Sequence, residues 1–160
     1  MNQIAQAMRI VTFRLGTDLF AADILAVERV LKYEAPRAVP NLPSWIEGVF
    51  EYQGRAVPVV DLRARFGLSS SQAGPHTRML VLSSAGEWVA VIVDAVLDVR
   101  PVEDADLQPP PALFRGLAGE YLRGLTRRDD ALVLLLDVDR LLQSQERLAL
   151  RDVSGIGEDA

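Results

Sequence analysis

The chain contains no cysteine and only one histidine, and both features limit the chemistry that it can perform. Without cysteine there is no disulfide, no thiolate metal site and no cysteine nucleophile. His76 lies between Pro75 and Thr77 in a polar connector, and no second histidine is present to complete a metal pair. We therefore expect no metal and no cofactor, and we interpret His76 as a solvated surface residue.

Long apolar runs and an excess of positive charge are missing as well. The longest apolar runs, of which 131–136 is one, have the length of one strand, whereas a membrane-spanning helix needs about 20 apolar residues. Residues 1–8 lack the charged and apolar regions of a secretory signal. The formal net charge is −5, and acidic residues flank the basic spot at Arg123, Arg127 and Arg128. Without a signal or a membrane span, we expect a cytoplasmic protein. Because nucleic-acid binding relies on clustered basic residues, we also expect that it binds no nucleic acid.

The sequence does contain 49% apolar residues among 160, which is ordinary for one soluble globular domain. These residues form short runs between glycine, proline and aspartate, a pattern that predicts strands joined by turns. Strands are expected at 9–15, 19–22, 27–31, 46–52, 55–60, 78–82, 88–93, 96–99, 121–126 and 131–136. Short helices are expected at 23–27 and 62–66, a longer helix at 138–150 and a loose tail at 151–160.

The two halves of the chain repeat one pattern. The segments Gly48–Asp61 and Gly124–Asp137 both span 13 positions, at an offset of 76. Residues 24, 27 and 30 match residues 93, 96 and 99 at an offset of 69, and a longer proline loop in the second half accounts for the difference. Each half is therefore predicted to form five short strands, which suit a small closed barrel because closure removes exposed edges. Two such barrels side by side leave a groove between them.

Asp61 and Asp137 are the carboxylates that most resemble catalytic groups. Their equivalent positions in the two repeats favour N-capping of a following helix, and a catalytic dyad is the alternative. Gly48 and Gly54 are six positions apart, but no Lys-Ser or Lys-Thr pair follows them, so they form no phosphate-binding loop. We interpret Gly48, Gly54 and Gly124 as structural residues, and we expect no enzyme.

Four segments read FRLGTDLFAADILAVERV at 13–30, LPSWIEGVFEYQGRAVPVVDLRARFGL at 42–68, VAVIVDAVLDV at 89–99 and YLRGLTRRDDALVLLLDVDRLL at 121–142. Together they resemble the CheW family of chemotaxis coupling proteins, over about residues 9–150. The run from Gly48 to Leu62 and the V-D-x-V segment from Val93 to Val96 are specific in combination, whereas each alone is weak.

The resemblance implies an all-β fold of two intertwined five-stranded SH3-like barrels, with short helices and a C-terminal helix. It places residues 1–150 in one domain, with one barrel from about 17–75 and the other from about 9–16 plus 76–140. It also implies a non-enzymatic adaptor that joins the cytoplasmic hairpin tip of a chemoreceptor to the regulatory domain of a CheA-type histidine kinase. The receptor tip is expected in the groove between barrels, and the kinase domain is expected to dock barrel to barrel.

Candidate contact residues follow from position. The receptor groove is assigned to Val27, Arg29, Val30, Glu51, Tyr52, Gln53 and Val57, and the kinase-facing patch to Leu42 and Trp45. Each assignment has an alternative that stays open. Val27 and Val30 could pack in the core instead of lining the groove, and Trp45 could plug one barrel end instead of facing the kinase. A groove suits the receptor tip because an amphipathic helix binds an apolar groove with a polar rim.

Three positions depart from the family pattern. Arg29 stands where the family usually has glutamate, Gln53 where it has arginine, and Glu51 where it has asparagine. We predict that Arg29 pairs with Glu51 across strands and that this altered polarity selects the partner. A divergent subunit of another chemosensory pathway, binding only one of the two partners, is the main alternative. A nucleic-acid-binding barrel and an enzyme are two further ones.

Overall fold

The computed structural model describes residues 8–43, 46–66, 68, 72–110 and 121–141. The strands are β1 (Met8–Leu15), β2 (Asp18–Asp23), β3 (Val27–Lys32), β4 (Ile46–Tyr52), β5 (Arg55–Asp61), β6 (Arg78–Ser84), β7 (Glu87–Val93), β8 (Ala95–Val102), β9 (Leu122–Arg128) and β10 (Ala131–Leu136). Between and after them lie the short helices η1 (Ile24–Ala26), α1 (Leu62–Arg65), η2 (Asp104–Asp106) and α3 (Val138–Leu141).

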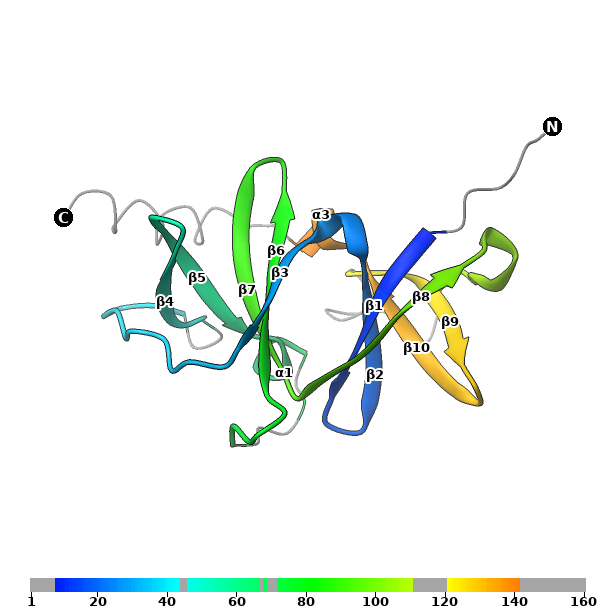
Figure 1. The fold of residues 1–160 in the computed structure, drawn as a ribbon, viewed down its shortest axis with the longest axis horizontal. Helices are drawn as coiled ribbons and strands as arrows, with labels where there is room; N and C mark the ends of the chain where they lie inside the picture. Colours follow the sequence, from blue (N-terminus) through cyan, green and yellow to red (C-terminus); the bar gives the residue numbers. More distant parts are fainter. Residues whose placement is uncertain (1–7, 44–45, 67, 69–71, 111–120, 142–160) are drawn as a thin grey trace.

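The strands form two five-stranded sheets that stand side by side (Figure 1). Barrel A has the strand order β8-β1-β2-β10-β9, and barrel B has the order β3-β6-β7-β5-β4. Neighbouring strands are antiparallel except for β2 with β10 and β5 with β7, which are parallel. An isolated bridge extends each sheet beyond its edge strand, from Arg37 to Val49 on β4 and from Gln108 to Leu125 on β9. The predicted architecture of two small five-stranded barrels is confirmed.

The two barrels are copies of one pattern that exchange a hairpin. β1 and β2 come from the first half of the chain but lie in one sheet with β8, β9 and β10, whereas β6 and β7 lie in one sheet with β3, β4 and β5. The register repeats as well, since Val30 pairs with Leu80 in barrel B and Val99 with Val11 in barrel A. The repeat found in the sequence is therefore an internal two-fold relation of the structure.

This exchange corrects the predicted division of the chain. We expected a boundary between residues 16 and 17 and a second boundary at 75, but β2 belongs with β1 and residues 78–93 belong with β3 to β5. β1 and β2 are joined by a tight turn at Gly16, whose φ of 62° is positive, and strands joined so closely pair with each other. Of the predicted helix 138–150, α3 covers 138–141, and the remainder and the tail 151–160 lie outside the described residues.

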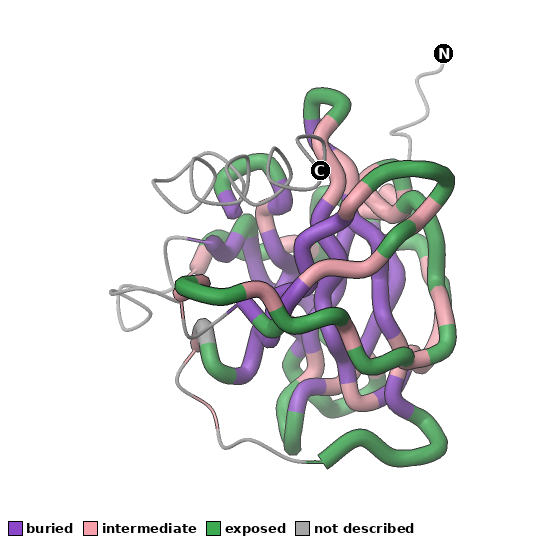
Figure 2. The backbone as a smooth tube through the Cα atoms, turned by 90° about the vertical axis from the view of Figure 1, so that its left-hand side faces the viewer, coloured by how far each residue is buried: buried purple, intermediate pink, exposed green. Residues whose placement is uncertain are grey.

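Alternation along the strands divides the apolar side chains among three cores. The central core lies between the two barrels and contains Phe13, Leu15, Phe20, Ala22, Ile46, Val60, Leu62, Leu80, Leu82, Val89, Val91, Val93, Tyr121, Leu122, Leu136, Val138 and Leu141. The interior of barrel B contains Val57, Val59, Met79, Val81, Ala90 and Ile92, and that of barrel A contains Ile10, Ala21, Val102, Val133 and Leu135. Figure 2 shows the buried strand centres surrounded by exposed turns. The contact between barrels is therefore filled by side chains, and only its margin is available to a partner.

Candidate protein-binding surface

Val27 and Val30 lie on β3, an edge strand of barrel B, on the side that faces the central core. Their cross-strand partners, Leu82 and Leu80, belong to that core, and residues opposite each other share a face of the sheet. Val27 packs against the central core, whereas Val30 is 43% exposed. The apolar face of the core therefore continues along β3 from Val27 to the solvent at Val30.

The second repeat presents the same arrangement on β8, which the sequence assignment of contact residues omitted. Val96 packs against the central core and Val99 is 44% exposed, at the positions equivalent to Val27 and Val30. A β-bulge interrupts each strand after the first valine, at Glu28 on β3 and at Leu97 on β8. We call Val27, Val30, Val96 and Val99 the seam margin. The sequence could have predicted the β8 contact residues, because the offset of 69 matches Val27 and Val30 with Val96 and Val99.

Val57 does not belong to this surface. Its exposed fraction is 1%, and it lies in the interior of barrel B opposite Phe50. Residues 57 and 59 point into the barrel because side chains alternate along β5. The assignment of Val57 to a groove is therefore wrong.

Tyr52 and Gln53 lie at the β4–β5 turn, at one end of barrel B. The Tyr52 ring contacts those of Phe50 and Trp88, with centroid distances of 6.1 and 5.3 Å, and the Arg55 guanidinium lies 3.9 Å from the Trp88 ring centroid. Gln53 donates from Nε2 to the Tyr52 hydroxyl at 3.3 Å. We call Phe50, Tyr52 and Trp88 the aromatic end of barrel B. This end is a surface separate from the seam margin, because its rings pack on the interior of barrel B.

The predicted ion pair between Arg29 and Glu51 is not formed among the described residues. β3 and β4, which carry them, are opposite edges of the strand order rather than neighbours. Arg29 pairs with Val81, an interior residue of barrel B, and so lies on the other face of β3 from Val30. Both charged side chains are exposed.

The predicted kinase-facing residues divide between described and undescribed parts of the chain. Leu42 is half-buried and packs against the central core. Trp45 lies outside the described residues.

Asp61 and Asp137 begin the short helices that end each repeat. Asp61 accepts from the Arg63 backbone N–H at 3.0 Å and is the N-cap of α1, and Asp137 accepts from the Arg140 backbone N–H at 3.0 Å. The buried Arg63 guanidinium donates to Asp94 at 2.9 Å and lies 3.6 Å from Asp61. Asp94 also accepts from the Gly16 backbone N–H at 2.6 Å. Arg63 and Asp94 therefore connect α1 of one repeat to the β1–β2 turn of barrel A.

Two carboxyl groups have shifted pKa values. Partial burial, followed by the charge and hydrogen bond of Asp61, raises the pKa of Glu47, and nearby Arg63 opposes this shift. Burial alone would raise the pKa of Asp98, but the hydrogen bond and charge of Arg128 at 2.8 Å lower it below its usual 3.8. The Glu47 shift is thus caused by burial beside the helix-capping Asp61, and the Asp98 shift by its ion pair with Arg128. Neither carboxyl lies in a set of residues that could act as a nucleophile or bind a metal.

The chemistry of these surfaces suits contact rather than reaction. Across the described ranges no group of histidine, cysteine, aspartate or glutamate residues could hold a metal ion. In the same part of the chain, no helix has the length and apolar character needed to cross a membrane. The fold and the exposed apolar margin define a two-barrel scaffold module.

The family to which this scaffold belongs is established by comparison. Residues 9–146 match the CheW-like domain, so the chain belongs to the CheW family. The chain is 32% identical to the chemotaxis protein CheW of Klebsiella aerogenes, over 89% of this chain and 86% of that protein. It is 33% identical to the protein FrzA of Myxococcus xanthus, over 86% of this chain and 87% of that protein.

A solved structure agrees with this membership. The scaffolding protein TtCheW from Thermoanaerobacter tengcongensis superimposes with a TM-score of 0.76 and 29% identity, covering 81% of this chain and 88% of that one. The barrels are accordingly SH3-like, and the protein is a non-enzymatic scaffold of chemotaxis-type signalling.

Proposed function

We propose that this scaffold couples the helical tip of a chemoreceptor to the regulatory domain of a CheA-type histidine kinase in the cytoplasm. The observation that carries the proposal is the exposure of Val30 and Val99 at equivalent positions of two edge strands. Among the described large apolar residues only Leu25, Val30, Val99 and Leu132 are exposed, and Leu25 lies in η1, the short helix that precedes β3. Exposed apolar residues that gather beside one seam are typical of a protein-binding surface.

The seam margin suits an amphipathic helix. Val30 and Val99 offer apolar contacts, and Glu28 and Lys32 supply a polar rim along β3. A helix with an apolar stripe can lie against such a surface, with its polar face in water. The helical hairpin of a receptor tip has this character.

We assign the kinase domain to the aromatic end of barrel B, and Leu42, which packs on the central core, stays a second candidate contact for that domain. Large rings that are half-buried contribute strongly to protein interfaces because they bury much area at little entropic cost. Assigning the two partners to the seam margin and to a barrel end leaves both free to bind at once.

The exposed Arg29 serves partner choice in this proposal. With no ion pair to Glu51, its charge is available to an acidic residue of the partner. Together with Gln53, it also favours the alternative that this subunit serves a divergent pathway and binds one of the two partners. An exposed charge of this kind alters specificity more than affinity.

The test is a pulldown with a receptor tip hairpin and a CheA-type regulatory domain, followed by kinase reconstitution. Val30→Asp and Val99→Asp should each abolish receptor binding and leave kinase-domain binding intact, because either places an unpaired charge in the contact. Leu132→Asp is the matched control: Leu132 is 42% exposed on β10 of barrel A, is not part of the seam margin and should tolerate the change. Receptor binding that survives both valine substitutions contradicts the proposal, and binding of a single partner by the wild type supports the divergent alternative.

A further inference from the structure

The ends of the two barrels differ chemically, although their strands pair in the same register. In barrel B the positions of Leu31 and Phe50 are apolar and pack on the barrel interior. Their counterparts in barrel A are Arg100 on β8 and Thr126 on β9, which take the equivalent pairings with Ile10 and Val133. Barrel A therefore has a cation, Arg100, where barrel B has the aliphatic Leu31, and a hydroxyl, Thr126, where barrel B has the ring of Phe50.

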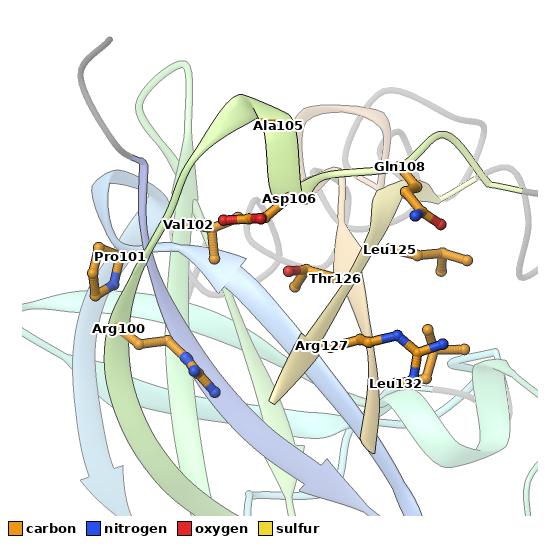
Figure 3. A pocket seen from close by; sticks show the side chains of 10 residues that line it. All are labelled: Arg100, Pro101, Val102, Ala105, Asp106, Gln108, Leu125, Thr126, Arg127 and Leu132. Carbon is orange, nitrogen blue, oxygen red and sulfur yellow. The ribbon is translucent and has the colours of Figure 1, made fainter. Parts of the chain in front are cut away.

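This exchange leaves a cavity of about 270 Å³ at the end of barrel A (Figure 3). It is lined by Arg100, Pro101, Val102, Ala105, Asp106, Gln108, Leu125, Thr126, Arg127 and Leu132. Arg100 and Thr126 point into the same space from β8 and β9, and Asp106 points into it from η2. The volume is just below the range typical of ligand pockets, which limits an occupant to a small molecule.

Opposite charges face this cavity without neutralising each other. Within the described residues, neither the Arg100 guanidinium nor the Asp106 carboxylate forms an ion pair or a side-chain hydrogen bond. The neighbouring Asp98 on β8 is paired with Arg128 at 2.8 Å, and the charge of Arg100 makes a smaller contribution to its lowered pKa. The second cation of the lining, Arg127, donates to the Asp130 carbonyl oxygen at 3.4 Å. Arg100 and Asp106 remain available, and together they complement a ligand with one charge of each sign.

We propose that the end of barrel A binds a small zwitterion of the α-amino acid type. The ligand carboxylate binds Arg100, its ammonium group binds Asp106, and its aliphatic side chain contacts Val102. Arg100 directly follows Val99 on β8, and the two side chains lie on opposite faces of that strand. The ligand site is thus one residue away from the seam margin, but its existence does not depend on the proposed function.

The test is an NMR titration of the full chain with L-leucine, observing backbone amides. We expect shifts confined to β8, η2 and β9, with a dissociation constant on the order of 1 mM, as befits a ligand of this size. Two matched probes remove one charge each: 4-methylpentanoate lacks the ammonium group, and 3-methylbutan-1-amine lacks the carboxylate. Each should bind about tenfold more weakly than leucine, because each leaves one protein charge unpaired.

Variants assign the charges. Arg100→Leu, which installs the barrel B counterpart, should abolish leucine binding, and Asp106→Asn should remove the preference for leucine over 4-methylpentanoate. Thr126→Phe should fill the cavity and exclude every probe, whereas Lys32→Leu, an equal charge loss on β3, should change nothing. The proposal is overturned if leucine produces no localised shifts, if Arg100→Leu retains binding while its spectrum remains folded, or if all three probes bind equally.

Discussion

Gly48 lies directly against the backbone of Arg37. A Cβ at Gly48 would lie 2.2 Å from the Arg37 carbonyl oxygen, and the φ of Gly48 is 153°. The two segments meet there because Arg37 and Val49 exchange backbone hydrogen bonds of 2.8 and 3.0 Å. Gly124 has the same relation to Gln108 in barrel A, with 2.8 Å to the carbonyl oxygen. Both glycines therefore permit a proline-loop segment to bridge the edge strand of its barrel.

The first prediction concerns this contact. Gly48→Ala should destabilise the protein by about 3 kcal/mol, because the neighbouring backbone must shift and the φ is unfavourable. Gly54→Ala is the control, since the φ of Gly54 is 77° but a Cβ at that position would have no atom within 4 Å. This control should cost about 1 kcal/mol. Urea unfolding of the two variants measures the difference, and equal losses contradict the role of the Arg37 contact.

The second prediction separates core from surface valines. Val57→Ala should destabilise by about 2 kcal/mol, because it leaves a cavity inside barrel B. Val30→Ala should cost less than about 0.5 kcal/mol, because Val30 is already partly solvated. Thermal melting of both variants provides the measurement. A large loss at Val30 would mean that this residue is core and unavailable to a partner.

The third prediction concerns the buried cation between the barrels. Arg63→Ala should destabilise by about 3 kcal/mol, because the carboxylates of Asp61 and Asp94 lose their buried counter-charge. Arg123→Ala removes a half-exposed partner 3.8 Å from Asp23 and should cost less than about 1 kcal/mol. Denaturant midpoints compare the two changes, and similar values would show that Arg63 contributes no more than a surface pair.

The fourth prediction is a pH dependence with two opposite signs. The raised pKa of Glu47 means that the folded state binds its proton more tightly, so this contribution to stability is present below pH 4.5 and is lost as pH rises through the raised pKa. The lowered pKa of Asp98 gives a contribution that is present above pH 3.8 and is lost as pH falls through the lowered value.

Unfolding measured from about pH 3 to about pH 7 tests both signs, and this range is set by the two reference pKa values. Glu47→Gln should flatten the decline in stability above pH 4.5, and Asp98→Asn should lower stability at neutral pH more than at acidic pH. Parallel curves of stability against pH for the wild type and either variant would show that the pKa of the corresponding carboxyl is the same in the folded and unfolded states.

Several features of the candidate surface could be predicted from sequence and several could not. Short apolar runs between turn residues identified β4 and β10 with their observed bounds, and the repeat matched Val27 and Val30 to Val96 and Val99. The burial of Val57 was missed because an alternating strand places every second residue on one face, and the pattern does not say which face is closed. The pairing of Arg29 with Glu51 failed because it requires β3 and β4 to be neighbours.

The sequence by itself determined the unit: hairpins, a proline loop and an aspartate-capped helix, repeated in two halves. These depend on local rules of turn geometry, alternation and capping, which act over a few residues. The tertiary structure alone decided that β1–β2 and β6–β7 exchange between the barrels, and that Arg100, Asp106 and Thr126 meet in one cavity. Such contacts form between residues far apart in the chain. They depend on the packing arrangement that buries the most apolar surface in the central core.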